Sequence, residues 1–237
     1  MEEFNNSDYK CFPLGDAAVV IQFGDIIDPV VNLKIKAICE WLDEYTFEGF
    51  IEYVPAYTTI IIYYQPWIVD YQELEGMIDE MLEGIAEEAI QVTRNLVEIP
   101  VFYGGDYGPD LEFVAAHNSI ATEKVIELHT TAEYLVYMIG FAPGFAYMGG
   151  MSEQIAAPRM ESPRAVISAG SVGIAGMQTG IYPIETPGGW RLIGRTPLVL
   201  FNAHRSSPSL LKAGDVVKFS SITELEYIKM KGGDDGY

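Results

Sequence analysis

The sequence predicts an α+β protein, in which an N-terminal α/β domain is followed by a domain built mostly from β-strands. Apolar residues repeat at helical spacing in two segments of the first third of the 237-residue chain. After residue 140, short apolar runs alternate with glycine and proline turns. Residues 1–92 hold 19 acidic and 3 basic residues, whereas residues 93–237 hold 15 and 11. This change in charge predicts a domain boundary near residue 92.

The predicted first domain, residues 1–92, begins with a strand and a helix. Apolar and polar residues alternate over 16–23, which is typical of a strand with one buried face. Asp28 and Pro29 provide an N-cap and a proline for the first turn of a helix. Apolar residues then repeat at intervals of three and four residues until Gly49, which ends the predicted amphipathic helix.

Two strands and a second helix complete this domain. The segments 50–54 and 58–64 are rich in β-branched and aromatic residues, and the second is apolar on both faces, so we expect it at the centre of a sheet. Asp70 and Glu73 resemble a capping box at the start of a second helix. The order β-α-β-β-α needs one more strand to complete a ferredoxin-like unit, and we predict a ferredoxin-like α/β domain.

The second domain opens with a mixture of strands and short helices. We predict strands over 96–103 and 133–141, with two short helices between them. Asp110 is placed to cap the first helix, and Thr122 to cap a second helix that ends near His129.

Later in the chain, the pattern becomes that of a β-barrel or sandwich. Five short apolar runs are separated by glycine and proline turns, at 165–168, 173–177, 191–193, 198–202 and 215–220. The last residues, from Lys231 onward, are polar and glycine-rich, so we predict a flexible tail.

Composition excludes several classes of protein. A net charge of −20 argues against nucleic acid and anionic membranes as partners. There is no run of 18 apolar residues and no signal-peptide pattern at the start, so we expect a cytoplasmic protein. Cys11 and Cys39 are too few for a disulfide scaffold, and we interpret both as buried thiols. The three histidines are scattered without nearby cysteines, so we predict no metal site.

Arginines gather in one glycine-rich segment. Five of the six arginines lie between residues 159 and 205, where Glu161 and Glu185 are the only acidic residues. Forked guanidinium groups favour carboxylate and phosphate ligands. We therefore predict an anion-binding or acyl-binding surface that includes Arg159 and Arg164, with pairing to acids elsewhere in the fold as the alternative for any single arginine.

Several long motifs carry a resemblance to a known family. They are residues 103–111, 125–130, 140–150 and 169–197, together with the pairs Pro158-Arg159 and Pro163-Arg164. With these motifs the chain resembles the family that comprises the first subunit of allophanate hydrolase and the B subunit of 5-oxoprolinase, and that also contains an inhibitor of a sporulation histidine kinase. The resemblance implies an N-terminal α/β domain and a C-terminal cyclophilin-like β-barrel. One departure is Ser168, where the family usually has proline.

The function that this resemblance implies is ATP-dependent opening of 5-oxoproline to glutamate by a 5-oxoprolinase, together with its homologous C subunit and its separate A subunit. Activation of the lactam and attack by water both develop negative charge, which arginines and backbone N–H groups can stabilise. No P-loop motif is present, and the sequence leaves open which member of the complex binds ATP.

Within this framework, His129 is the candidate catalytic residue. A histidine can act as a general base or orient an acyl oxygen near neutral pH, and the alternative is a histidine at a helix C-terminus that is satisfied by backbone carbonyls. Ser171 lies in Ala-Gly-Ser-Val-Gly, which superficially resembles a nucleophile elbow. Strand-like residues follow it, however, where an elbow requires a helix, and we do not assign it a nucleophilic role.

The remaining candidates are substrate-binding groups near glycines. Gln178 and Tyr182 are placed to hydrogen-bond a ligand amide or to stabilise turns. Trp190 follows Gly188 and Gly189, and either covers one end of the barrel or offers a stacking surface for a ligand.

Three alternative functions stay open at this stage. Allophanate and 5-oxoproline both present a compact amide and a carboxylate, so a component of an allophanate hydrolase-type enzyme is one alternative. A non-enzymatic inhibitor of a sensor histidine kinase is another. A prolyl isomerase, which rests on fold analogy alone, is the weakest.

Overall fold

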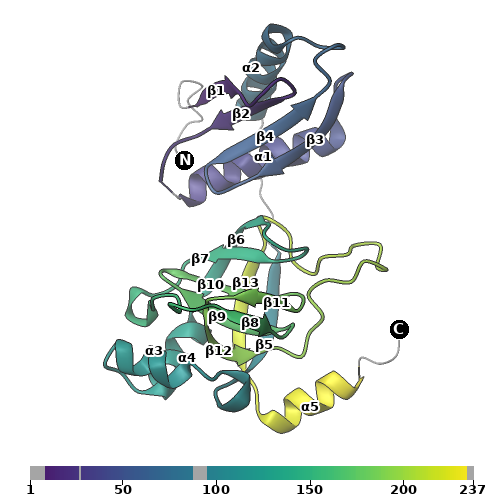
Figure 1. Cartoon of the computed structure of the whole chain (residues 1–237). Helices are drawn as coiled ribbons and strands as arrows, with labels where there is room; N and C mark the ends of the chain where they lie inside the picture. The colour runs from purple at the N-terminus through teal and green to yellow at the C-terminus, as the bar shows by residue number, and fades with distance from the viewer. Residues whose placement is uncertain (1–8, 27, 88–94, 234–237) are drawn as a thin grey trace. The chain divides into compact units, whose positions relative to one another are not determined.

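The computed structural model describes residues 9–26, 28–87 and 95–233 (Figure 1). The chain divides into two compact units, residues 1–93 and residues 94–237, called here the N-terminal unit and the C-terminal unit. Across the described ranges, no helix is long and apolar enough to cross a membrane.

The N-terminal unit is an antiparallel sheet with two helices (Figure 1). In chain order its elements are β1 (Lys10–Pro13), β2 (Ala18–Gln22), α1 (Pro29–Glu44), β3 (Phe50–Pro55), β4 (Thr59–Tyr64) and α2 (Tyr71–Glu87). The strands lie in the order β1-β2-β4-β3, so the doubly apolar strand β4 is central, as predicted.

The sheet differs from the predicted ferredoxin-like unit in the strand that occupies its fourth position. That prediction expected the β-α-β-β-α order to be completed by a further strand, and the next strand in the described chain belongs to the C-terminal unit. The position beside β2 is instead occupied by β1, which precedes β2 in sequence. Strand β1 has only four residues, none of them fully buried, so it has little of the alternation by which a strand is recognised.

The predicted starts of α1 and α2 are confirmed. The carboxylate of Asp28 accepts a hydrogen bond from the Val30 N–H at 2.7 Å, and Pro29 is the first helical residue of α1. Asp70 and Glu73 form the reciprocal capping box at α2, with N–H to carboxylate distances of 2.9 and 3.2 Å. The apolar faces of both helices join the core of the sheet, which includes Ile60 of β4.

The C-terminal unit is built around a closed β-barrel. Its strands, in chain order, are β5 (Leu96–Tyr103), β6 (Glu133–Ile139), β7 (Ala146–Gly149), β8 (Arg164–Ile167), β9 (Ser171–Ala175), β10 (Gln178–Ile181), β11 (Thr186–Gly188), β12 (Arg191–Arg195) and β13 (Val216–Ser221). Seven of these close the barrel in the order β10-β7-β6-β13-β5-β12-β9, and β8 and β11 pair separately. The barrel-or-sandwich pattern of the sequence is therefore a barrel.

Helices lie outside this barrel, two of them together on one side and the last one beyond the end of β13 (Figure 1). They are η1 (Gly105–Tyr107), α3 (Leu111–His117), α4 (Thr122–Thr131), η2 (Glu153–Ile155) and α5 (Glu224–Gly233). Helix α5 continues to Gly233, so the first part of the predicted flexible tail, from Lys231 to Gly233, is helical. Residues 234–237 of that predicted tail lie outside the described residues.

Of the predicted caps of the next two helices, that of α4 is wrong and that of α3 is confirmed in its position only. Helix α4 begins after Ala121, and the Thr122 hydroxyl donates to the carboxylate of Glu123 instead of accepting a backbone N–H. Asp110 does occupy the N-cap position of α3, but its carboxylate caps no backbone N–H of that helix. A stronger partner, described below, holds this carboxylate.

His129, at the end of α4, lies in the core of the barrel. One ring nitrogen, Nδ1, lies 2.8 Å from the Tyr103 hydroxyl, and the other, Nε2, lies 2.9 Å from the Thr179 hydroxyl. The ring is fully buried and packs against Phe219, with ring centroids 4.4 Å apart. Burial lowers the pKa of His129 from 6.5 to about 3, because the cation loses its hydration in the core.

Asp110 forms an ion pair that joins distant segments of the C-terminal unit. Its two carboxylate oxygens each accept an N–H from the Arg164 guanidinium at 2.9 Å, and one of them also accepts the Leu192 N–H at 2.7 Å. The Asp110 side chain is only 9% exposed and that of Arg164 is 26% exposed. The chain before α3 is thus bound to the start of β8 and to β12 by one carboxylate.

We predict that His129 makes the stability of the chain depend on pH. Between pH 6.5 and about 3 the unfolded chain binds a proton at this ring and the folded chain does not. Stability therefore falls with decreasing pH in this window, by up to about 1.4 kcal/mol per pH unit from this group. Urea unfolding at several pH values measures the free energy of unfolding. This free energy should depend less steeply on pH in His129→Gln than in the wild type.

The matched control is His117→Gln, an exposed histidine in the same unit. This variant should keep the wild-type pH dependence, because the buried ring is still present. Equal slopes for His129→Gln and the wild type would contradict the prediction.

We also predict that Asp110→Ala destabilises the chain by about 2 to 3 kcal/mol, since it leaves a largely buried guanidinium without its carboxylate. This value is near the low end for buried pairs because Arg164 keeps some contact with water. Glu127→Ala, which removes an exposed pair with Lys124 on α4, should cost less than about 1 kcal/mol. Urea unfolding measures both, and equal losses would refute the role of Asp110.

Candidate functional site

The candidate site is a cavity of about 260 Å³ on the C-terminal unit. It is formed by β7 and the segment before it, the segment before β8, the residue after β10, and β11 with the turn that leads to β12. Its lining residues are Phe141, Phe145, Tyr147, Arg159, Pro163, Tyr182, Pro187, Gly188, Gly189 and Trp190.

Aromatic rings form the walls of this cavity. The ring of Phe145 lies at the centre, with centroid distances of 5.0 Å to Tyr147 and 5.5 Å to both Tyr182 and Trp190, all edge to face. Such arrangements fix ring positions because the positive ring edge meets the negative ring face. Phe145, Tyr182 and Trp190 are buried, so the walls are rigid before any ligand arrives.

Phe141 stands apart from these walls at the mouth of the cavity. Its side chain is 65% exposed and its ring lies 5.4 Å from that of Phe145. Its backbone has φ of 66°, a left-handed conformation that is unfavourable for a residue with a bulky side chain. The fold therefore holds an exposed aromatic ring at the opening of the cavity at some cost in backbone energy.

Glycine at position 188 is required for the shape of the cavity. A Cβ atom built on Gly188 would lie 2.5 Å from the Tyr182 hydroxyl oxygen and 2.8 Å from the side chain of Ile167. Any other residue would push Tyr182 out of place. The glycine-rich turn predicted to bind substrate thus also lets a buried phenol reach the cavity wall.

Arg159 supplies the positive charge of the cavity. Its guanidinium carbon lies 6.0 Å from the Trp190 ring centroid, within the range of a cation–π contact. No carboxylate in the described part of the chain lies within ion-pair distance of it. Burial raises the pKa of the Tyr182 phenol, although a backbone hydrogen bond from Trp190 and the charges of Arg159 and Arg164 act against that rise.

Three of the other four arginines of this segment have structural partners. Arg164 is held by Asp110, and its guanidinium also contacts the Met160 sulfur at 2.7 Å. Arg191 donates to the Pro158 carbonyl and lies 3.6 Å from the centroid of the Phe113 ring. Arg195 donates to the Ala169 carbonyl at 2.8 Å. For these residues, pairing within the fold accounts for the charge.

The structure gathers five of the eight predicted site residues in one cavity: Arg159, Tyr182, Gly188, Gly189 and Trp190. Arg164 is close, since it pairs with Gly188 between β8 and β11, but its guanidinium is engaged by Asp110. Gln178, at the start of β10, does not line the cavity.

The predicted catalytic role of His129 does not fit its position. A general base must contact the substrate or a water bound beside it, and this ring is fully buried with both nitrogens engaged. Its lowered pKa also reflects a core residue with no access to water. We therefore correct that assignment and describe His129 as part of the barrel core.

Two other sequence interpretations can be compared with the structure. Ser171 is the first residue of strand β9 and is buried, in agreement with its exclusion as a nucleophile. Cys11 and Cys39 are half-buried, and burial raises the pKa values of their thiols to about 11 and about 12. Among the residues that the structure describes, no cluster of three or more metal-ligating side chains occurs.

Sequence reasoning missed five lining residues, two of which are the prolines Pro163 and Pro187. The other three, Phe141, Phe145 and Tyr147, lie in the motif of residues 140–150 on which the family resemblance rests. Three aromatic side chains within seven residues, beside two glycines and a proline, were the available signal, because such a segment places rings on a fixed turn.

Comparison with known proteins points to the same family as the sequence motifs. The carboxyltransferase domain, subdomain C and D, matches residues 9–211. The B subunit of 5-oxoprolinase from Bacillus subtilis is 50% identical over 229 residues, which cover 92% of this chain and 95% of that protein. The corresponding B subunit from Escherichia coli O157:H7 is 39% identical over 89% of this chain and 94% of its own length. The urea amidolyase of Saccharomyces cerevisiae is more distant, at 22% identity over 91% of this chain and 13% of that protein.

A solved structure supports the fold. The crystal structure of TTHA0988 superposes with a TM-score of 0.77 at 33% identity. This chain covers 40% of the length of TTHA0988, and 87% of this chain is matched. The family match over residues 9–211 includes every segment that forms the cavity. By these matches, the chain belongs to the carboxyltransferase subdomain C and D family, which includes the B subunits of 5-oxoprolinase.

Proposed function

We propose that this chain is the B subunit of an ATP-dependent 5-oxoprolinase and that its aromatic cavity binds part of the substrate. The observation that carries the proposal is the pairing of a cation, Arg159, with rigid aromatic walls in a small cavity. A compact lactam ring with one carboxylate, such as 5-oxoproline, matches this combination. Relatives that carry the name of this 5-oxoprolinase component, at 50% and 39% identity, support the choice of reaction.

The size and chemistry of the cavity suit such a substrate. At about 260 Å³ it is smaller than the cavities of roughly 300 to 1,000 Å³ that hold drug-sized ligands. The carboxylate would pair with the Arg159 guanidinium, and the apolar ring atoms would pack against Phe145 and Trp190. Charge-assisted hydrogen bonds of this kind orient a ligand as well as binding it.

The catalytic groups would come from the other members of the complex. With His129 in the barrel core, Tyr182 and Tyr147 are the remaining proton-transfer candidates along the cavity wall. Burial raises the pKa of the Tyr182 phenol, so this group holds its proton at neutral pH. Opening the lactam needs phosphoryl transfer from ATP to the amide oxygen, then attack by water and release of phosphate. We therefore propose that the homologous C subunit and the A subunit complete the site, with ATP bound by the complex.

A component of an allophanate hydrolase-type enzyme is the second candidate. It is favoured by the urea amidolyase relative, which is 22% identical over nearly the whole chain. The higher identity to 5-oxoprolinase components favours the first candidate. Inhibition of a sensor histidine kinase stays a prediction from the sequence.

The proposal predicts that activity requires all three components. Glutamate release from 5-oxoproline and ATP should be absent with this chain alone and appear when the C and A subunits are added. Allophanate in place of 5-oxoproline tests the second candidate in the same assay. Robust turnover of 5-oxoproline by the isolated chain would refute a shared site, and turnover of allophanate alone would reverse the choice of substrate.

A second prediction concerns Arg159. Arg159→Ala should lower kcat/KM of the reconstituted complex by about 10- to 150-fold, the effect of losing a charge-assisted hydrogen bond worth about 1.5 to 3 kcal/mol. Arg159→Lys should recover part of the loss, because the ammonium keeps the charge but not the forked geometry. Steady-state kinetics with 5-oxoproline measures both variants.

The matched control for these variants is Arg205→Ala, an exposed arginine outside the cavity lining. It should keep full activity. Thermal unfolding should be unchanged for all three variants, since Arg159 is exposed and carries no ion pair within the described residues. Full activity of Arg159→Ala would move the substrate site elsewhere.

A further inference from the structure

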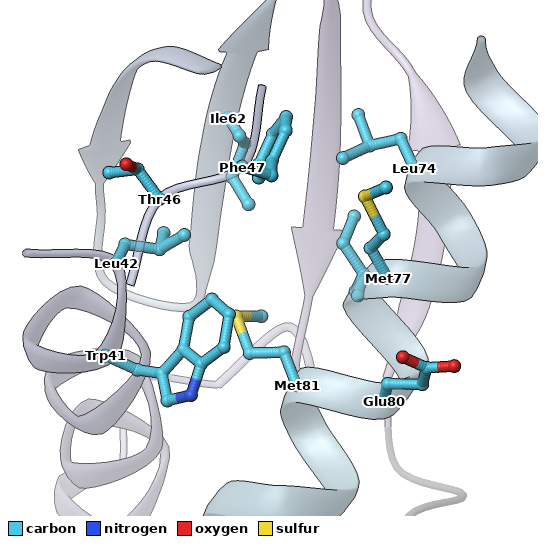
Figure 2. A pocket seen from close by; sticks show the side chains of 10 residues that line it. Trp41, Leu42, Thr46, Phe47, Ile62, Leu74, Met77, Glu80 and Met81 are labelled. Carbon is cyan, nitrogen blue, oxygen red and sulfur yellow. The ribbon is translucent and has the colours of Figure 1, made fainter. Parts of the chain in front are cut away.

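A second cavity lies in the N-terminal unit, between α1 and α2. It has a volume of about 450 Å³, and the two helices stand far enough apart for Ile62 of the central strand to line it (Figure 2). Trp41 and Leu42 reach it from α1, and Leu74, Met77 and Met81 reach it from α2 (Figure 2). This cavity belongs to a different unit from the proposed substrate site and is independent of the proposed function.

The walls of this cavity are apolar and partly open to solvent. Leu42, Ile62 and Leu74 are core residues, so they form a dry floor. Met77 is 43% exposed at the rim, and Trp41 is half-buried. Methionine side chains are flexible and polarisable, and they are frequent where a surface accepts apolar side chains of a partner. The floor and rim together can take one or two apolar side chains inserted between the helices.

Acidic residues border this apolar surface. The sequence of α2 holds six acidic residues and no lysine or arginine. Glu80 itself lines the cavity, three residues after Met77 and therefore on the same side of the helix. On α1, Glu44 follows Trp41 at the same spacing. An apolar cavity with carboxylates along its edges is complementary to apolar side chains that are flanked by basic ones.

We propose that the cavity between α1 and α2 is a docking site for a basic amphipathic helix of a partner protein. The partner would insert aliphatic or aromatic side chains, spaced three or four residues apart, between Trp41 and Met77. Its lysines or arginines would face Glu80 and Glu44, which fixes the direction of the helix and speeds association. A second copy of this chain is a poor occupant, because a net charge of −20 on each copy opposes their association.

The test uses the full chain and two synthetic helical peptides with the same leucine pattern. One carries lysines on its polar face and the other carries glutamates. Fluorescence anisotropy of the labelled peptides should show saturable one-to-one binding of the leucine–lysine peptide and no binding of the leucine–glutamate peptide. The affinity should fall as the salt concentration rises.

Variants locate the binding. Met77→Glu should lower the affinity for the leucine–lysine peptide by about tenfold or more, and Met77→Ala should lower it by a smaller factor. The circular dichroism spectra of both variants should match that of the wild type. Met230→Glu is the matched control, because Met230 is 42% exposed on a helix of the other unit. It should bind as the wild type does. Equal binding by the Met77 and Met230 variants would overturn the proposal.

A further pair of variants separates docking from general attraction to an acidic protein. Glu80→Lys should weaken binding several-fold more than Glu52→Lys, which makes the same charge change at an exposed position of β3 in the same unit. Equal losses for the two would mean that the peptide binds net charge alone. Two results would refute the proposal of a partner helix. If the chain binds phosphatidylcholine vesicles and Met77→Glu does not, the cavity faces a membrane. If the chain self-associates and Met77→Glu does not, the cavity binds a second copy.

Discussion

The buried carboxylate of Asp110 is the interaction on which the arrangement of the C-terminal unit depends. It joins the chain before α3 to Arg164 at the start of β8 and to the backbone of β12 at Leu192. The chain passes close to β12 in this region, since a Cβ on Gly108 would lie 2.1 Å from the Ile193 carbonyl oxygen. Strand β8 in turn pairs with β11, whose Gly188 forms part of the cavity. The cavity wall is therefore supported by an ion pair that lies outside the cavity lining.

This arrangement divides the arginines between structure and binding. Arg164, Arg191 and Arg195 hold carbonyls, a carboxylate and an aromatic ring of the fold. Arg159 lies over Trp190 with no carboxylate of the described chain at ion-pair distance. A guanidinium in that position can exchange water for a ligand carboxylate without first breaking an internal pair. Of these four arginines, Arg159 is the one that lines the cavity and whose guanidinium is available to an anionic ligand.

The two units offer different surfaces for recognition. The C-terminal cavity combines rigid aromatic walls with a cation and is small, which suits a compact anionic ligand. The cavity of the N-terminal unit is larger, is lined by methionine and aliphatic side chains, and has acidic edges, which suits a basic protein segment. The two cavities therefore favour ligands of opposite charge.

The sequence by itself determined the local features of this protein. Helical spacing and the caps at Asp28 and Asp70 predicted α1 and α2, and the turn pattern after residue 140 predicted a barrel or sandwich. The motif of residues 140–150 and the two Pro-Arg pairs indicated the family, and five of the residues grouped from the sequence, Arg159, Tyr182, Gly188, Gly189 and Trp190, line one cavity. These features depend on neighbours in sequence, or on motifs long enough to be specific.

Tertiary structure alone decided the partners of the polar side chains. Asp110 had the sequence position of a helix cap, and only the fold brought Arg164, 54 residues away, to its carboxylate. His129 had the position of an accessible residue at the end of a helix, and only closure of the barrel placed Thr179, 50 residues away, against its ring. Strand β1 is likewise decided by the tertiary structure, because this short strand is recognised only by its pairing with β2. Burial and long-range pairing determine whether a charged or titratable group is structural or functional, and neither can be obtained from the order of residues along the chain.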